Sequence, residues 1–308
     1  MKYMKVSVVN FHPVWGDKQR NRDKMISFVQ KAAEEGSKLI LFPETALTGY
    51  ENEPDVSKKD KMQIRLAETL NDETALLMAQ LSSRFHMYIV YGFPERDSVY
   101  PDIVYNAAAV ICPDGRKMSY HKIHLPADES DWAAAGDEPM VFDTEYGKIG
   151  LSICYDTYSF PELIRYAKAK GARLFLNPTA CNDDVFHAVP LQMQLEEHSL
   201  TNSIFIASAN LCGDCHSQHF VGGSSIIGMK RNTIKEAAYY AGFPFGFAGS
   251  CKEDVYTADL DLSIADEVYG TPMYIHNPQV GHPDFRPEIY AKMYAALSAD
   301  SEWRAKCS

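Results

Sequence analysis

The chain has 308 residues, of which 46% are hydrophobic and 23% are charged, and its net charge is −11. This acidic balance argues against a nucleic-acid partner and against an anionic membrane surface, because both call for a basic patch on the protein. No run of about eighteen apolar residues occurs, so we expect a globular protein with no membrane partner.

Predicted strands and helices alternate along the chain without an intervening linker. Residues Lys5–Val9 predict a strand, and Lys18–Glu35 predicts an amphipathic helix that Gly36 ends. The apolar run Leu39–Phe42 predicts a second strand, which completes a βαβ unit with parallel strands. Further along, the patterns predict helices over Met62–Arg84 and Leu191–Asn202, and strands over Tyr88–Gly92, Ala107–Cys112, Ile149–Cys154 and Ile204–Ala209.

Three chemically active side chains lie where apolar strands end. Glu44 follows the second predicted strand and Pro43, which cannot donate to a strand ladder. Lys122 alternates with apolar residues, and Cys154 ends a strand just before a helix that is predicted to begin near Ser159. Each residue alone is more often structural than catalytic. Together they supply a base, a cation and a thiol, which are the groups that acyl transfer by a cysteine requires.

Two stretches of the sequence repeat one pattern. Gly36–Glu44 and Gly171–Thr179 each contain a helix-stopping glycine, a basic residue, an apolar strand, a proline and a polar side chain. Two equivalent half-units would suit a sandwich of two sheets with helices outside. Because any helix, loop and parallel strand can converge on this pattern, the repeat alone does not establish that architecture.

Three motifs carry a resemblance to a known family. Phe42-Pro43-Glu44, Lys122–Pro126 and Ile153–Asp156 resemble the signature segments of the nitrilase, or carbon–nitrogen hydrolase, superfamily, in the family's order of Glu, Lys and Cys. Similarity extends to Tyr105-Asn106, Asn177-Pro178, Gly222–Ile227 and Arg286–Tyr290. The resemblance implies an α/β fold, a four-layer αββα sandwich of two mixed sheets with outer helices.

The family's organisation suggests how the chain is divided. We predict a carbon–nitrogen hydrolase domain over residues 1–270 and a C-terminal tail over residues 271–308. Members of the family commonly dimerise through outer helices, so the tail is predicted to pack at a subunit interface of a homodimer or a higher homo-oligomer. The resemblance points to the amidase-like branch.

The resemblance also assigns chemical roles. Cys154 would attack the substrate as a thiolate, Glu44 would act as the base, and Lys122 with the backbone N–H of Tyr155 would hold the oxyanion. A further acidic residue often lies seven positions before a glycine, which selects Glu129 over the neighbouring Asp128 and Asp131. The remaining candidates for contact with the substrate or the oxyanion are Asn177 and Tyr158.

The residues after the cysteine bear on the substrate. Family members that bind a substrate carboxylate often have arginine three or four positions later, where this chain has Thr157 and Tyr158. Without that bidentate partner, we expect a neutral or cationic small amide or an N-carbamoyl amine, unless Arg165 or Arg173 reaches the site. The Cys-Tyr-Asp sequence favours amides over nitriles, and nitrile hydrolysis on the same triad remains an alternative.

A second cysteine motif offers a rival hypothesis. Cys212, Cys215 and His216, with His219 nearby, resemble haem-attachment or zinc-site spacing, so a metal-binding or non-catalytic protein stays open as an alternative. The N-terminus lacks a signal-peptide pattern, and seven cysteines without framework spacing fit a reducing cytoplasm. We expect no cofactor and no metal, and Cys181 is interpreted as a small core residue.

Overall fold

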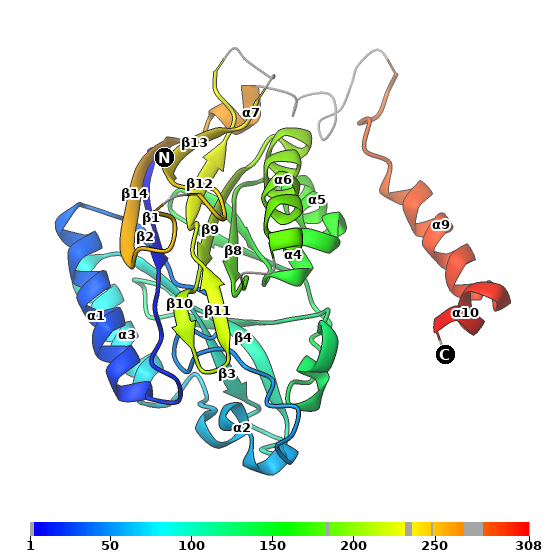
Figure 1. The fold of residues 1–308 in the computed structure, drawn as a ribbon. Helices are drawn as coiled ribbons and strands as arrows, with labels where there is room; N and C mark the ends of the chain where they lie inside the picture. The colour runs from blue at the N-terminus through cyan, green and yellow to red at the C-terminus, as the bar shows by residue number, and fades with distance from the viewer. Residues whose placement is uncertain (1–2, 183–184, 232–235, 248, 268–279, 308) are drawn as a thin grey trace.

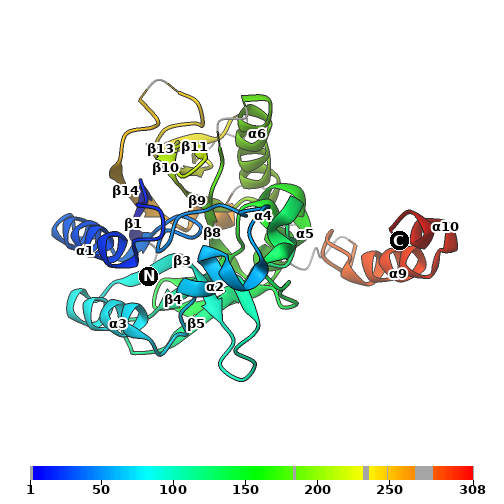
Figure 2. The same cartoon turned by 60° about the horizontal axis from the view of Figure 1, so that its bottom comes forward.

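The computed structural model describes residues 3–182, 185–231, 236–247, 249–267 and 280–307. The described residues form two six-stranded sheets that pack face to face, with helices on both outer faces (Figures 1 and 2). The predicted four-layer αββα sandwich is therefore confirmed. In this described part of the chain, no helix is long and apolar enough to cross a membrane.

The first sheet has the strand order β14-β1-β2-β3-β4-β5. Its middle strands β1, β2 and β3 are parallel, and the flanking pairs are antiparallel. The strands are β1 (Tyr3–Asn10), β2 (Leu39–Leu41), β3 (Tyr88–Arg96), β4 (Val104–Ile111), β5 (Lys117–His121) and β14 (Asp254–Asp261).

The second sheet repeats this plan, with the order β13-β12-β9-β8-β7-β6 and β7, β8 and β9 parallel. The strands are β6 (Met140–Thr144), β7 (Gly147–Leu151), β8 (Ala172–Thr179), β9 (Phe205–Asn210), β12 (Ser225–Gly228) and β13 (Ala238–Gly242). The two repeated sequence stretches contain β2 and β8, each of which is the middle strand of a parallel trio. The repeated sequence pattern thus corresponds to two structurally equivalent half-units.

Three layers of apolar side chains hold the sandwich together. The central layer lies between the sheets and includes Val8, Val90, Leu151 and Leu174. The outer layers lie beneath the helices, where alternate residues of each buried strand point away from the central core. The covering helices are α1 (Lys18–Glu34) and α3 (Glu73–Phe85) on the first sheet, and α5 (Pro161–Ala169) and α6 (Val185–Asn202) on the second (Figure 1).

Some predicted elements differ from the structure. The helix predicted over Met62–Arg84 is two helices, α2 (Met62–Leu66) and α3, because Glu68 pairs with the edge of β3 and Asp72 accepts the backbone N–H of Thr69. The strand predicted to reach Cys154 ends at Leu151. The remaining short elements are α4 (Tyr155–Ser159), α7 (Ile264–Glu267), two 3₁₀ turns (Lys58–Asp60 and Ala127–Asp131), β10 (Cys212–Cys215) and β11 (Gln218–Val221).

The C-terminal helices stand apart from the sandwich. Helices α9 (Pro287–Ala299) and α10 (Ser301–Cys307) project to one side in both views (Figures 1 and 2). No residue of α9 is buried, and its link to the body includes a hydrogen bond from Tyr294 to Glu162 at the start of α5.

Candidate active site

Glu44 lies just beyond the carboxyl end of β2, in the first sheet. The backbone turns directly after the strand, and the turn rests against Gly92 of β3. A Cβ atom on Gly92 would lie 2.5 Å from the Pro43 carbonyl oxygen and 2.3 Å from the Thr45 nitrogen, so only glycine lets the turn approach this closely. The turn leaves the Glu44 side chain 1% exposed.

Lys122 follows β5 in the same sheet, and its side chain is fully buried. Its ammonium contacts two carboxylates, with Nζ 2.7 Å from Glu44 Oε1 and 2.9 Å from Glu129 Oε2. Asn106 of β4 bridges the same two residues, because its Nδ2 donates to Glu44 Oε1 at 2.7 Å and to Glu129 Oε1 at 2.9 Å. Tyr50 completes the cluster by donating its hydroxyl to Glu129 Oε2 at 2.6 Å.

These contacts fix the charges of the cluster. Burial lowers the pKa of Lys122, but the Glu129 and Glu44 carboxylates outweigh it and raise that pKa well above its usual value, so the ammonium stays charged. Burial raises the pKa of Glu44, and the neighbouring Cys154 adds to the rise while Lys122 opposes it. Among the described residues, Glu44 Oε2 has no hydrogen-bond partner. The cluster therefore presents an unoccupied carboxylate oxygen of raised proton affinity.

The second sheet delivers Cys154 just beyond β7. Its backbone has φ +50° and ψ −107°, a conformation that costs a residue with a side chain about 1–3 kcal/mol. Two acceptors at the end of β8 hold it there, since the Cys154 N–H donates to the Pro178 carbonyl at 3.0 Å and to Asn177 Oδ1 at 3.1 Å. Helix α4 begins at Tyr155, earlier than the sequence predicts. The strain and the contacts resemble those of a positioned nucleophile.

The side chains behind Cys154 are uncharged. Asn177 Nδ2 donates to the Tyr158 hydroxyl at 3.2 Å, and that hydroxyl donates to Thr179 Oγ1 at 3.3 Å. Cys181 Sγ lies 3.3 Å from Thr179 Oγ1 and 3.6 Å from the Tyr158 hydroxyl. The neighbouring Cys181 thiol and burial raise the pKa of Cys154, and the Lys122 ammonium opposes the rise.

Asp156 joins the segment that carries Lys122 to the one that carries the cysteine. Its Oδ1 accepts the backbone N–H of His124 and His124 Nδ1, both at 2.8 Å. Its Oδ2 accepts the Tyr120 hydroxyl at 2.7 Å and the Ile123 N–H at 3.1 Å. Because these donors flank Lys122 in sequence, Asp156 fixes the spacing between the two halves of the site.

Comparison with known proteins agrees with this geometry. The carbon–nitrogen hydrolase family matches residues 5–267. The chain is a carbon–nitrogen hydrolase. The hydrolase is 30% identical to an omega-amidase of Xenopus laevis over 284 residues, and this alignment covers 87% of this chain and 92% of the omega-amidase. It is also 30% identical over 234 residues to a probable nitrilase of Schizosaccharomyces pombe, over 75% of this chain and 82% of the relative.

Solved structures share the fold of the hydrolase. Saccharomyces cerevisiae Nit3, a member of branch 10 of the nitrilase superfamily, matches with a TM-score of 0.72 and 23% identity over 86% of this chain and 93% of that chain. An amidase from Nesterenkonia sp. matches with a TM-score of 0.68 and 23% identity over 86% and 93%. The family and its relatives together make the chain an amidase-type hydrolase of carbon–nitrogen bonds.

The fold of the hydrolase brings its predicted site residues together. Glu44, Lys122 and Glu129 form one buried cluster, and Cys154 is close enough to raise the pKa of Glu44 and of Lys122. Asp131, the rival to Glu129, is half exposed and lies 3.8 Å from Lys61.

The other candidates take different places. The Asn177 amide binds protein partners, namely the Cys154 N–H, the Tyr158 hydroxyl and the Ser208 hydroxyl. Tyr158 is buried behind the thiol, and Tyr155 is partly exposed beside it. Sequence reasoning missed the roles of Tyr50 and Asn106. An amide in the otherwise apolar strand β4 was the available signal for Asn106.

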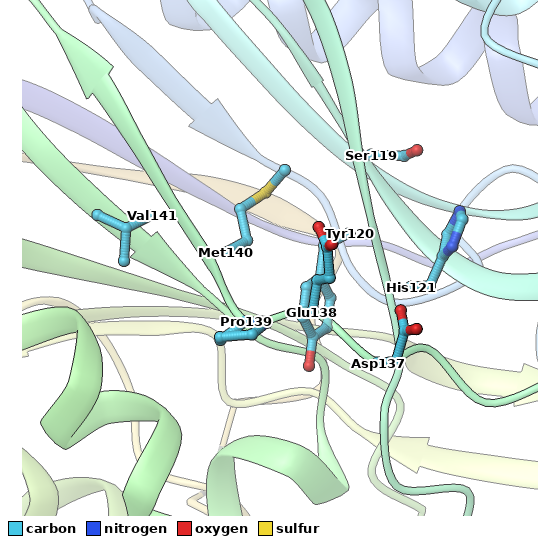
Figure 3. A pocket seen from close by; sticks show the side chains of 8 residues that line it. All are labelled: Ser119, Tyr120, His121, Asp137, Glu138, Pro139, Met140 and Val141. Atoms are coloured by element: carbon cyan, nitrogen blue, oxygen red, sulfur yellow. The ribbon is translucent and has the colours of Figure 1, made fainter.

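A separate cavity of about 330 Å³ lies between β5 and the segment that leads into β6 (Figure 3). Its lining consists of Ser119, Tyr120, His121, Asp137, Glu138, Pro139, Met140 and Val141. None of the cluster around Lys122 lines it, so we do not assign the reaction to this cavity.

The rival cysteine motif of the hydrolase forms a β-hairpin of β10 and β11. Cys212 and Cys215 are both buried in β10, three residues apart, so their side chains leave the strand on opposite faces. In the described ranges, no group of three or more His, Cys, Asp or Glu side chains is arranged to hold a metal ion. The hairpin therefore gives the metal-binding alternative no support.

Proposed function

We propose that the enzyme hydrolyses a small linear amide or an N-carbamoyl amine through a thioester on Cys154. The observation that carries this proposal is the buried Lys122 ammonium, which lies between two carboxylates and acts electrostatically on the cysteine. Amide carbons are poor electrophiles, so the reaction needs a nucleophile, a base and a stabiliser of the developing charge. This cluster can supply all three.

In the first half-reaction, Cys154 Sγ attacks the carbonyl carbon and its proton passes to Glu44. The unpartnered oxygen Glu44 Oε2 is suited to accept it. An ammonium has three N–H donors, of which Lys122 uses two on Glu44 and Glu129, so a third remains for the oxyanion. The backbone N–H of Tyr155 would provide the second oxyanion donor. Glu44 then protonates the leaving nitrogen as the carbon–nitrogen bond breaks.

In the second half-reaction, water cleaves the thioester. Glu44, again a carboxylate, takes a proton from the water as its oxygen attacks the acyl carbon. The carbon–sulfur bond breaks, the acid leaves, and the thiol of Cys154 recovers its proton. Glu129 orients Lys122 through its hydrogen bond, while Tyr50 holds Glu129.

The charges near the nucleophile favour an uncharged substrate. Thr157 and Tyr158 stand where an arginine would hold a carboxylate, and both are buried. Two other arginines were candidates for binding a substrate carboxylate, and both lie elsewhere. Arg173 pairs with Asp266 at 2.7 Å, and Arg165 lines a surface cavity between α5 and α9. A neutral or cationic small amide therefore fits better than a dicarboxylate monoamide.

Ammonia release from a panel of short amides, carbamoyl amines, nitriles and carboxylate-bearing amides tests the proposal. Acrylamide and butyramide are natural first members, since the amidase from Nesterenkonia sp. has been crystallised with each. We expect turnover of neutral amides or carbamoyl amines and a covalent acyl adduct on Cys154 by mass spectrometry. Turnover of nitriles alone, or activity that survives in Cys154→Ala, would contradict the proposal.

We also propose that the enzyme is a homodimer, or a higher homo-oligomer, assembled through its C-terminal tail. Helix α9 exposes Tyr290, Met293 and Tyr294 on the described chain, and an isolated apolar helix of this kind gains stability by packing on a partner. Light scattering on a Met293→Ser, Tyr294→Ser variant should give a smaller mass than on the parent. The control is Leu76→Ser on α3, and an unchanged mass in the α9 variant would contradict the proposal.

The compartment is a further proposal. The six cysteines whose side chains the structure describes are all free thiols. Free thiols in this number are typical of a reducing compartment, so we infer that the enzyme works in the cytoplasm. Fractionation of cells that make the enzyme should recover its activity in the cytoplasmic fraction, and recovery in an exported fraction would contradict the inference.

A further inference from the structure

Beside the nucleophile lies a second thiol that the proposed reaction does not use. Cys181 is 6% exposed, and its Sγ lies 3.6 Å from the Tyr158 hydroxyl. The same hydroxyl accepts from the Asn177 amide, whose oxygen holds the Cys154 N–H. Both cysteine side chains also pack in the same apolar cluster beneath α5 and α6. Two thiols that share these neighbours can form a disulfide where the backbone allows their approach.

The backbones on both sides of this thiol pair are held firmly. Cys181 donates its N–H to Asn210 Oδ1 at 2.8 Å, and its carbonyl accepts the Val221 N–H at 3.1 Å. Cys154 is held by the end of β8 and by the first turn of α4. These hydrogen bonds fix the backbone at both cysteines. Rotation about the side-chain bonds is the motion left to bring the two sulfur atoms together.

The two thiols differ in access. Cys154 is partly exposed because substrate must reach it, whereas Cys181 lies behind it against the hydroxyls of Thr179 and Tyr158. A small oxidant that enters the substrate path therefore meets Cys154 first and Cys181 second. This order is the one that a reactive thiol and its resolving thiol require.

We propose that Cys154 and Cys181 form a two-thiol redox site that a hydroperoxide, such as hydrogen peroxide, converts to a disulfide. The Cys154 sulfur attacks one peroxide oxygen as its proton passes to Glu44, which breaks the oxygen–oxygen bond and gives a sulfenic acid and a hydroxide that takes up the proton. The Cys181 sulfur then attacks the sulfenic sulfur and displaces its hydroxide. Two thiols lose two electrons and two protons, and the peroxide gains both and becomes two molecules of water.

The consequence is protection of the nucleophile. A sulfenic acid with no thiol nearby is oxidised further to sulfinic and sulfonic acids, which thiol reductants do not reverse. The Cys154–Cys181 disulfide stops that sequence at a state that a dithiol reductant restores. The pair therefore makes oxidative inactivation of the enzyme reversible.

The test combines a mass readout with an activity readout. The purified enzyme is treated with hydrogen peroxide, digested without reduction, and analysed for a peptide that joins Cys154 to Cys181. We expect this cross-link, loss of activity, and recovery of most activity after dithiothreitol. Absence of the cross-link at a dose that inactivates the enzyme would overturn the proposal.

The deciding variant is Cys181→Ser, which keeps a polar atom beside Thr179 and cannot form the disulfide. With each protein normalised to its own untreated activity, we expect at least about tenfold less recoverable activity in Cys181→Ser, with sulfinic or sulfonic acid on Cys154. Equal recovery in the variant would overturn the proposal. The matched control is Cys251→Ala, which removes an exposed thiol outside the pair and should recover like the parent.

The inference rests on the proposed function only where activity is the readout. If the enzyme releases no ammonia from any tested compound, the proposed function fails, while the cross-link can still be detected by mass. If amide turnover is found and no cross-link forms, the redox site fails alone. The two failures are therefore distinguishable.

Discussion

The two walls of the site are built from equivalent strands yet carry opposite kinds of chemistry. The wall from the first sheet holds Glu44, Lys122 and Glu129 as fully ionic partners at 2.7–2.9 Å. The wall from the second sheet holds Cys154 and Cys181 among hydroxyl and amide groups that carry no charge. The proposed reaction therefore separates charge and proton transfer from the nucleophile, although β2 and β8 occupy equivalent positions in their sheets.

In the proposed reaction, this division lets a thiol react although its own surroundings do not ionise it. Burial raises the pKa of Glu44, and the neighbouring Cys154 and the second carboxylate of the first wall, Glu129, add to the rise while Lys122 opposes it. The second wall does nothing to ionise Cys154, whose pKa is raised by the Cys181 thiol and by burial. We infer that the thiol keeps its proton until a substrate arrives and then passes it to Glu44 during attack.

Removing the charge from the first wall should have the largest effect. In Lys122→Met, two carboxylates face each other without a cation and the oxyanion loses a donor. We expect kcat to fall by about 10³-fold or more and the free energy of unfolding to fall by about 3–5 kcal/mol, the usual result of breaking a buried ion pair. Steady-state kinetics and urea unfolding measure the two effects.

A second buried lysine, Lys168, provides a control that distinguishes an effect on stability from an effect on catalysis. Lys168 of α5 is buried, and its ammonium donates to the carbonyls of Ser203 and Ala265 at 2.9 and 2.8 Å, on the outer side of the second sheet. Lys168→Met should lower stability and leave kcat close to that of the parent enzyme. Equal losses of kcat in both variants would mean that Lys122 acts only as a structural residue.

Changing the inner carboxylate should have the next largest effect. Glu129→Gln keeps the size of the side chain but removes the charge that orients Lys122, so we expect kcat to fall by about 10²-fold. Asp131→Asn, two residues away and half exposed, is the matched control and should retain activity. If Asp131→Asn lowers kcat more than Glu129→Gln does, Asp131 and not Glu129 is the carboxylate that supports Lys122.

The pH dependence of kcat/KM measures the protonation of Glu44 in the first wall. Protonated Glu44 cannot accept the thiol proton, and its raised pKa moves this protonation to a pH above the ordinary glutamate value of 4.5. Activity should therefore fall about tenfold per pH unit below a midpoint that lies above 4.5. Because the Glu129 charge contributes to the rise, the midpoint should move to lower pH in Glu129→Gln. A midpoint at or below 4.5 would contradict the role of Glu44.

The sequence predicted the residues proposed to react better than the residues that support them. Glu44, Lys122 and Cys154 could be selected because each lies in a short motif at a strand end, and the parallel pairing of β1 with β2 followed from the βαβ pattern that ends at Leu39–Phe42. Tyr50 could not, because its hydrogen bond joins residues 79 positions apart. Such contacts depend on how the two sheets pack, and local patterns do not contain that information.

Other misses have local causes. The helix predicted over Met62–Arg84 fails because Glu68 finds hydrogen bonds on the edge of β3 that outweigh helix propensity. The cysteine hairpin β10–β11 was not predicted, because its four-residue strands are too short to show alternation. Cys181 was interpreted as a core residue, and it is buried, but the sequence held no sign of its contact with Cys154.

The uncharged wall should respond least to substitution. Tyr158→Phe removes a hydroxyl that accepts from Asn177 and donates to Thr179 at 3.2 and 3.3 Å, so one buried amide N–H loses a partner. We expect stability to fall by about 1–3 kcal/mol, and kcat to fall by less than about tenfold because Asn177 still binds the Cys154 N–H.

The comparison with Tyr240→Phe completes this last test. The Tyr240 hydroxyl binds the Met229 carbonyl in the second sheet, away from the thiol. Its loss should change stability without changing kcat. If Tyr158→Phe lowers kcat as much as Glu129→Gln does, the hydroxyl takes part in the chemistry, and the second wall can no longer be described as a support for the nucleophile alone. If it lowers kcat only slightly, the division of labour between the two sheets stands, because positioning is then shared among several neutral contacts while charge is concentrated on a few.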